Sequence, residues 1–259
     1  MTELNLINVC KTYKHQMVAL QEINLSVPSG QFLIILGSSG AGKSTLMRIL
    51  NGLEMPSRGR VVIDGIELKP QNLKAIRTRI GVVFQQFNLV DRLNVMTNVL
   101  AGRLGRRNWL LSSLFLFPKS DIRLAHWALA RVGLVDKAWA RADQLSGGQQ
   151  QRVGIARALA QEPNLILADE PVASLDPVTS VEIMSLLKEI CREQGITIVA
   201  NLHQLEYARD YADRIIGLNQ GRIVFDGFPA DLTPQAEASI YQRHTFAKEG
   251  SHDLVLADS

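Results

Sequence analysis

A glycine-rich segment that ends in a lysine and a serine carries the clearest chemical pattern in this chain. It reads Gly37-Ser38-Ser39-Gly40-Ala41-Gly42-Lys43-Ser44 and fits the pattern G-x-x-x-x-G-K-[ST] at every fixed position. The glycines let backbone N–H groups turn inward around a polyphosphate, Lys43 reaches the outer phosphates, and the Ser44 hydroxyl is able to ligate Mg²⁺. The segment therefore predicts a site for a polyphosphate and a divalent cation.

The residues on either side of this segment favour a strand before it and a helix after it. Residues 32–36 are all apolar, as in a buried parallel strand, and residues from Thr45 to Leu50 show helical apolar spacing. A glycine-rich turn before an ordinary helix is the simpler alternative. That alternative does not explain why Gly-Lys-Ser stands at the helix start.

Acidic and amide side chains follow two further apolar runs. Asp169 and Glu170 end the run that begins at Leu165, and Gln85 follows the run 80–84. Carboxyl ends of parallel strands meet at the ligand edge of a sheet, which places Asp169 in a Mg²⁺ shell and makes Glu170 a candidate base. Paired carboxylates at a strand end are often only solvated, but Pro171 and the apolar run favour the ligand edge.

Four other features have simpler explanations when each is taken alone. Tyr13 precedes the glycine-rich segment and could stack on a purine, although a tyrosine there is more often an ordinary surface or core residue. Ser146-Gly147-Gly148-Gln149 opens a helical pattern, where Ser is also a common N-cap. Asp176 lies in Ser-Leu-Asp-Pro, and His203 follows a predicted strand, where a lone histidine is usually structural.

The composition is that of a globular protein that binds no nucleic acid. Hydrophobic residues make up 46% and charged residues 20%, with a net charge of +3. The basic residues are interspersed with acidic ones, which gives no support to nucleic-acid binding. Cys10 and Cys191 lack metal-ligand spacing and are expected to be reduced thiols.

No segment reads as a signal peptide or a membrane span. The N-terminus lacks a basic start with an apolar core, and the apolar run 109–117 is shorter than the ~20 residues that a spanning helix needs. We therefore expect a protein that is not exported and meets membranes only through a partner.

The order of patterns along the chain predicts an antiparallel layer, a core around the glycine-rich segment and a helical region. Alternating residues in 4–9 and 18–27 indicate antiparallel strands, and the region from Asn88 to about Glu162 shows helical patterns. Within that region, Ser120 is a candidate N-cap and Trp127 is expected in the core.

The order of these motifs resembles that in ATP-binding subunits of ABC transporters, over residues 3 to about 232. The resemblance implies an α/β P-loop cassette with a mostly parallel core sheet, an antiparallel β layer and an inserted helical subdomain. The ATP-binding domain would span 1–245, with the helical subdomain at about 88–162, followed by a frayed tail at 246–259.

The resemblance also implies a role at ATP or Mg²⁺ for each candidate residue. On the subunit's own nucleotide, Tyr13 would stack on adenine and the loop Gly37–Thr45 would bind the phosphates. Ser44 and Asp169 would bind Mg²⁺, and Gln85 would sense the metal and the transporter. Glu170 would activate water, and His203 would contact the γ-phosphate. In a homodimer, Ser146, Gly147, Gly148 and Gln149 would close over the ATP of the opposite subunit, and Asp176 would link the two subunits.

Two segments are similar to the ATPases of phosphonate importers. These are the insert 102–120 and Ala-Asn-Leu-His-Gln at 200–204, where Ala-Asn-Leu departs from the usual apolar run before the histidine. This similarity implies ATP-driven uptake of a phosphonate or a related oxyanion such as phosphite. The partners would be a membrane permease and a periplasmic or lipid-anchored binding protein, with the ATPase at the cytoplasmic face of the cell inner membrane.

Three alternatives remain at this point. Another ABC system, for lipid or lipoprotein export or for import of another small solute, would use a similar cassette. A soluble ABC-type ATPase of ribosomes or DNA repair would usually carry two cassettes or a long coiled-coil insert, and a P-loop kinase would have no use for Leu-Ser-Gly-Gly-Gln. The single compact cassette favours transport.

Overall fold

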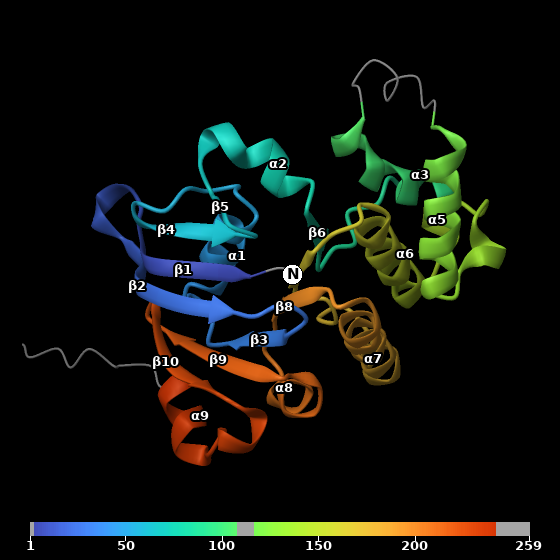
Figure 1. The fold of residues 1–259 in the computed structure, drawn as a ribbon. Helices are drawn as coiled ribbons and strands as arrows, with labels where there is room; N and C mark the ends of the chain where they lie inside the picture. Colours follow the sequence, from blue (N-terminus) through green and yellow to red (C-terminus); the bar gives the residue numbers. More distant parts are fainter. Residues whose placement is uncertain (1–2, 108–116, 242–259) are drawn as a thin grey trace, which may run out of the picture.

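A computed structural model describes residues 3–107 and 117–241 of the chain (Figure 1). Two β-sheets lie against each other, and a group of helices stands beside them as a separate lobe (Figure 1). The predicted tail 246–259, Trp109 and residues 108–116 of the insert lie outside the described residues.

The central sheet has six strands and is mostly parallel. Its order is β10-β9-β3-β8-β7-β6, and β10 alone among these strands pairs antiparallel. The strands are β3 (Phe32–Leu36), β6 (Ile80–Val83), β7 (Leu165–Asp169), β8 (Thr197–Asn201), β9 (Arg214–Asn219) and β10 (Arg222–Gly227). The continuous apolar run of β3 is explained by burial on both faces, since alternate side chains enter two different hydrophobic cores.

An antiparallel sheet covers one face of the central sheet. Its order is β2-β1-β4-β5, which confirms the predicted antiparallel layer. The strands are β1 (Leu4–Thr12), β2 (Val18–Val27), β4 (Arg58–Ile63) and β5 (Ile66–Glu67). Helix α1 (Lys43–Leu50) buries Leu46, Ile49 and Leu50 in the core that the two sheets share.

Other helices pack on the sheets or connect them. Helix α7 (Pro177–Gln194) runs from the end of β7 back toward the start of β8. Its apolar residues join the core that contains Phe32, Ile34 and Leu36 of β3. The remaining elements of this part are the 3₁₀ helix η1 (Lys14–Gln16), η2 (Pro70–Asn72), α2 (Leu73–Arg77), α8 (Leu205–Tyr211), η6 (Pro229–Asp231) and α9 (Pro234–Tyr241).

Between residues 88 and 162 the described part of the chain forms helices joined by turns, with no strand and one isolated bridge between Asn94 and Arg141. Their elements are α3 (Val95–Leu100), η3 (Ala101–Arg106), α5 (Lys119–Arg131), η4 (Val135–Lys137), η5 (Ala142–Gln144) and α6 (Gly147–Ala160). They form the lobe in Figure 1 that stands apart from the antiparallel sheet.

Two local predictions for α5 were wrong. The helix begins at Lys119 with Pro118 as N-cap, so Ser120 lies in the first turn. Buried Asp121 fixes this start by accepting hydrogen bonds from Arg103 Nε at 3.1 Å and Arg107 Nε at 2.7 Å. Trp127 is 41% exposed rather than in the core, because α5 buries the face that carries Ala125, Ala128 and Leu129.

The described helices include none long and apolar enough to cross a membrane.

Candidate functional site

The glycine-rich segment forms a tight loop between β3 and α1, as its pattern predicted. Gly42 occupies the N-cap of α1 with φ 107°, and a Cβ on it would lie 2.6 Å from the carbonyl oxygen of Ala19. A Cβ on Gly37 would lie 2.4 Å from the carbonyl oxygen of Leu218. Larger residues would push this loop away from the neighbouring strands, so both glycines are needed for its shape.

Lys43 is the buried cation of the site. Its side chain is 5% exposed, and Nζ donates to the carbonyl oxygens of Gly37 at 2.6 Å and Ser38 at 3.1 Å. Burial lowers the pKa of this amine, while the negative charges of Glu170 and Asp169 oppose the shift. A cation that is desolvated at the base of a loop of backbone N–H groups suits a phosphate.

The two carboxylates follow each other at the end of one strand, β7. Asp169 is the last residue of β7, and its Oδ1 accepts a hydrogen bond from Asn201 Nδ2 on β8 at 2.8 Å. Glu170 follows with φ 47°, a left-handed conformation that is uncommon for a residue other than glycine. Its Oε1 lies 2.8 Å from Nε2 of His203. The structure therefore brings together three of the predicted residues at the sheet edge.

Tyr13 is held by hydrogen bonds from its hydroxyl. The phenol donates to Glu54 Oε2 at 2.6 Å and lies 3.3 Å from Thr45 Oγ1, while Lys11 Nζ stands 5.2 Å from the ring centroid. Burial opposes ionisation of Glu54, but hydrogen bonds from Tyr13 and Lys11 more than offset it, so the pKa of Glu54 is lowered. Sequence reasoning missed Glu54, because no local pattern connects it to Tyr13.

These groups surround one cavity of about 320 Å³. Its lining consists of Tyr13, Met17, Val18, Ala19, Ser38, Ser39, Gly40, Ala41, Gly42, Lys43, Ser44, Thr45, Glu170 and His203. Residues 17–19 were not predicted, since nothing in their pattern marks the start of β2 as a neighbour of the loop. Asp169 lies beside Glu170 in the chain without lining the cavity itself.

Other predicted residues lie away from this cavity. Gln85 is exposed just beyond the end of β6. Ser146 caps α6 and shares a capping box with Gln149, while Gly147 and Gly148 form the first turn. Asp176 caps α7 through the N–H of Thr179 at 3.0 Å, and a Cβ on Gly148 would lie 2.4 Å from Thr179 Cγ2. The starts of α6 and α7 therefore form one surface that is separate from the glycine-rich loop 37–44, called the phosphate loop below.

The residues of the cavity suit a nucleotide together with Mg²⁺. The loop glycines keep a concave backbone, and the buried Lys43 Nζ donates to two backbone carbonyl oxygens of the loop. The Ser44 hydroxyl and the Asp169 carboxylate are the oxygen ligands that Mg²⁺ prefers. Within the described ranges no cluster of three or more His, Cys, Asp or Glu side chains is able to hold a metal.

The comparisons with known proteins agree with this geometry. The family model described as ABC transporter matches residues 20–173. Among curated relatives, a protein of Thiobacillus denitrificans named "Phosphonates import ATP-binding protein PhnC" is 57% identical over 257 residues, which is 99% of each chain. A protein of Trichodesmium erythraeum named "Phosphonates import ATP-binding protein PhnC 2" is 55% identical and covers 96% of each chain.

A solved structure shares both the fold and part of the sequence. It is the dimeric structure of a post-hydrolysis state of the ATP-binding cassette MJ0796, bound to ADP and Pi. The match has a TM-score of 0.73 and 39% identity, and covers 87% of this chain and 98% of that chain.

Proposed function

Since the chain belongs to the ABC transporter family, we propose that it is the ATP-hydrolysing subunit of an importer that takes up a phosphonate or a related oxyanion. The observation that carries the ATPase part is the cavity that joins the phosphate loop to Glu170 and His203. The substrate part is supported by the names of the full-length relatives. The proposed domain is 1–245, with a helical subdomain at 88–162 and a tail at 246–259.

In the proposed reaction the chain supplies binding groups and a base. Backbone N–H groups of the loop and Lys43 Nζ bind the β- and γ-phosphates, with the carbonyl contacts of Lys43 exchanged for phosphate oxygens. Ser44 and Asp169 would hold Mg²⁺, which when bound neutralises charge on the phosphate oxygens. Glu170 accepts a proton from the attacking water, and His203 orients its carboxylate.

Each active site is proposed to need two copies of the chain. Ser146–Gln149 and Asp176 lie outside the cavity that holds the phosphate loop. A second copy that turns its own α6 and α7 starts toward that cavity would complete it. The similar cassette in its ADP-bound and Pi-bound form is dimeric, which supports this arrangement.

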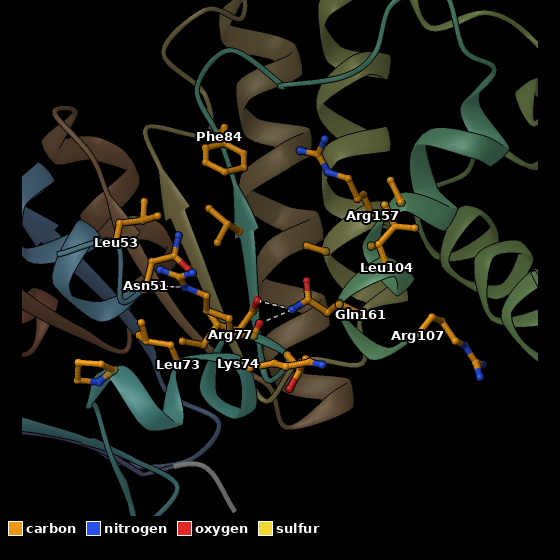
Figure 2. A pocket seen from close by; sticks show the side chains of 18 residues that line it. Asn51, Leu53, Leu73, Lys74, Arg77, Phe84, Leu104, Arg107, Arg157 and Gln161 are labelled. Carbon is orange, nitrogen blue, oxygen red and sulfur yellow. Dashed lines mark hydrogen bonds between the residues drawn. The ribbon is translucent and has the colours of Figure 1, made fainter. Parts of the chain in front are cut away.

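The permease is proposed to dock beside Gln85, Gln86 and Phe87, at the cytoplasmic face of the inner membrane. A larger hollow of about 810 Å³ lies between α2 and β6 on one side and η3 and α6 on the other (Figure 2). Its lining includes the apolar residues Phe84 and Leu104. Four of its lining residues are basic and none is acidic. Arg157 Nη2 donates to the carbonyl oxygen of Phe87 at 2.9 Å, and burial lowers the pKa of this guanidinium.

These contacts fit a permease loop with an apolar face and a carboxylate. Cysteine pairs between Leu104 or Phe87 and that loop should crosslink in the assembled complex, in a background that lacks Cys10 and Cys191. Val224 on β10 is 42% exposed and serves as the control position that should not crosslink. Crosslinking at the control position alone would place the interface elsewhere.

Growth tests the transport part of the proposal. A strain that lacks this gene should fail to grow on a phosphonate as its sole phosphorus source and should grow normally on phosphate. The parent gene should restore growth and Glu170→Gln should not. Equal growth and phosphonate uptake with and without the gene would overturn the substrate while leaving the ATPase proposal intact.

A further inference from the structure

Asn201 is a polar residue in the buried part of the central sheet. It is the last residue of β8 and is fully buried between β3 and β7, where it pairs in register with Ile35 and Asp169. Its neighbours Val199, Ala200 and Leu202 are also buried. A buried amide costs folding free energy unless its polar atoms are hydrogen-bonded.

Asn201 holds both acidic residues of the site. Its Nδ2 donates to Asp169 Oδ1 at 2.8 Å, and its carbonyl oxygen accepts from the N–H of Glu170 at 3.1 Å. One residue thus contacts the side chain of the first carboxylate residue and the backbone of the second. The order β3-β8-β7 makes this possible, because β8 lies between the strand that leads into the phosphate loop and the strand that ends in Asp169.

The amide is only partly satisfied by hydrogen bonds. Its Oδ1 is buried and has no hydrogen-bond partner within the described part of the chain. An unpaired buried acceptor costs folding free energy, whereas an apolar residue of the same shape avoids that cost. The ladder between β7 and β8 already pairs four residues before Asp169, so the side-chain bond is not needed to join the strands. A buried polar side chain that is only partly satisfied is commonly kept for function.

We propose that Asn201 is a positioning residue for the Mg²⁺ site. Its amide fixes Oδ1 of Asp169, which prevents rotation of the carboxylate and leaves Oδ2 as the oxygen available to the metal. This inference rests on the proposed ATPase function. Partners that orient a metal-binding side chain typically change metal affinity 10- to 100-fold when they are removed, roughly the scale expected here.

The test is Asn201→Leu, which keeps the shape of the side chain and removes both polar atoms. The Mg²⁺ concentration for half-maximal ATPase activity should rise about 10- to 100-fold. Mg²⁺ should also raise the thermal midpoint of the ADP-bound variant less than that of the parent. Without nucleotide or metal, the midpoint of the variant should change little, because removal of the unpaired acceptor offsets loss of the hydrogen bond to Asp169.

Thr197→Val is the matched control at the other end of β8. Thr197 is buried, and its Oγ1 accepts from the N–H of Gly30 at 3.0 Å. This control should lower the midpoint and leave the Mg²⁺ dependence unchanged. If Asn201→Leu does not fold, Asn201→Val makes the same comparison with a residue that favours strands.

A folded variant with the parent's Mg²⁺ dependence, in both the ATPase and the thermal-midpoint measurement, would show that Asn201 is only structural. Failure of the proposed function is a separate outcome, because the parent protein would then lack Mg²⁺-dependent ATPase activity altogether.

Discussion

His203 and Glu170 face each other across the ends of two parallel strands, with Nε2 and Oε1 2.8 Å apart. The contact holds the Glu170 carboxylate at the wall of the cavity that contains the phosphate loop. The left-handed backbone of Glu170, at φ 47°, turns its side chain out of the direction of β7. A carboxylate held in this way is placed to take a proton from a water that attacks a bound phosphate.

We expect Glu170→Gln to bind MgATP, to dimerise and to turn over about 10²–10⁴-fold more slowly than the parent. The amide has the shape of the carboxylate and still hydrogen-bonds His203, so binding should be retained while the base is lost. Phosphate release, measured beside size-exclusion chromatography with MgATP, checks both effects.

Lys43→Ala is the control for that experiment, because it should lose nucleotide binding itself. Its Nζ is the buried cation beside the loop carbonyls of Gly37 and Ser38. Hydrolysis by Glu170→Gln at near the parent rate would mean that another group is the base.

Ser146→Arg should block dimer closure without preventing ATP from binding to the single subunit. The exposed Ser146 side chain caps α6 and belongs to a surface outside the subunit's own cavity, so a long cation there meets only the second copy. Two measurements separate ATP binding from dimer closure. The first is binding of a fluorescent ATP analogue, and the second is the MgATP-dependent dimer fraction with Ser146→Arg placed in the Glu170→Gln background.

Ser146→Thr is the matched control, since threonine keeps a hydroxyl cap on the helix. It should dimerise like its parent. A Ser146→Arg protein that dimerises normally would exclude this surface from the interface.

The loop and its flanking elements could be predicted because their signals are local. The apolar run of β3, the glycines and the start of α1 are contiguous in sequence, and each reflects its own backbone requirement. The wrong prediction for Trp127 has the opposite origin. Helical periodicity shows that α5 has an apolar face, but Trp127 lies about 200° around the helix from Ala125, and only packing against the other helices decides which face is buried.

The supporting contacts of the site could not be predicted for a similar reason. Tyr13 and Glu54 are 41 residues apart, and Asn201 and Asp169 are 32 residues apart. Their pairing depends on which strands become neighbours, and the sequence pattern gives strands without their order. The polar residue within the run Ala-Asn-Leu was visible, but its partner was not.

Tyr13→Ala should weaken ATP binding by about 1–3 kcal/mol, the usual scale for loss of an aromatic stack on a base. Tyr13→Phe should retain most of the affinity, because it keeps the ring and loses only the hydroxyl contacts with Glu54 and Thr45. Titration with ATP and with inorganic triphosphate distinguishes base contacts from phosphate contacts, since triphosphate binding should be equal in all three proteins. Equal losses of ATP affinity in both variants would assign the effect to the hydroxyl instead of the ring.

The stability of the protein should fall between about pH 9 and pH 11 because of Cys191. This thiol is 1% exposed, and burial, assisted by the charge of Asp213, raises its pKa from 9.0 to about 11. The folded state keeps the proton through this range while the unfolded state releases it. The stabilising contribution is therefore present below pH 9 and is lost as the pH rises through 11, by about 3 kcal/mol.

Urea unfolding at a series of pH values, with Cys191→Ala beside the parent, isolates this contribution. The variant should be less stable at pH 8, because it leaves a small cavity, and its free energy of unfolding should decline less than that of the parent above pH 9. Cys10→Ser, which changes the other cysteine, should keep the steeper decline of the parent. Parallel curves for Cys191→Ala and the parent would show that this thiol ionises equally in the folded and unfolded states.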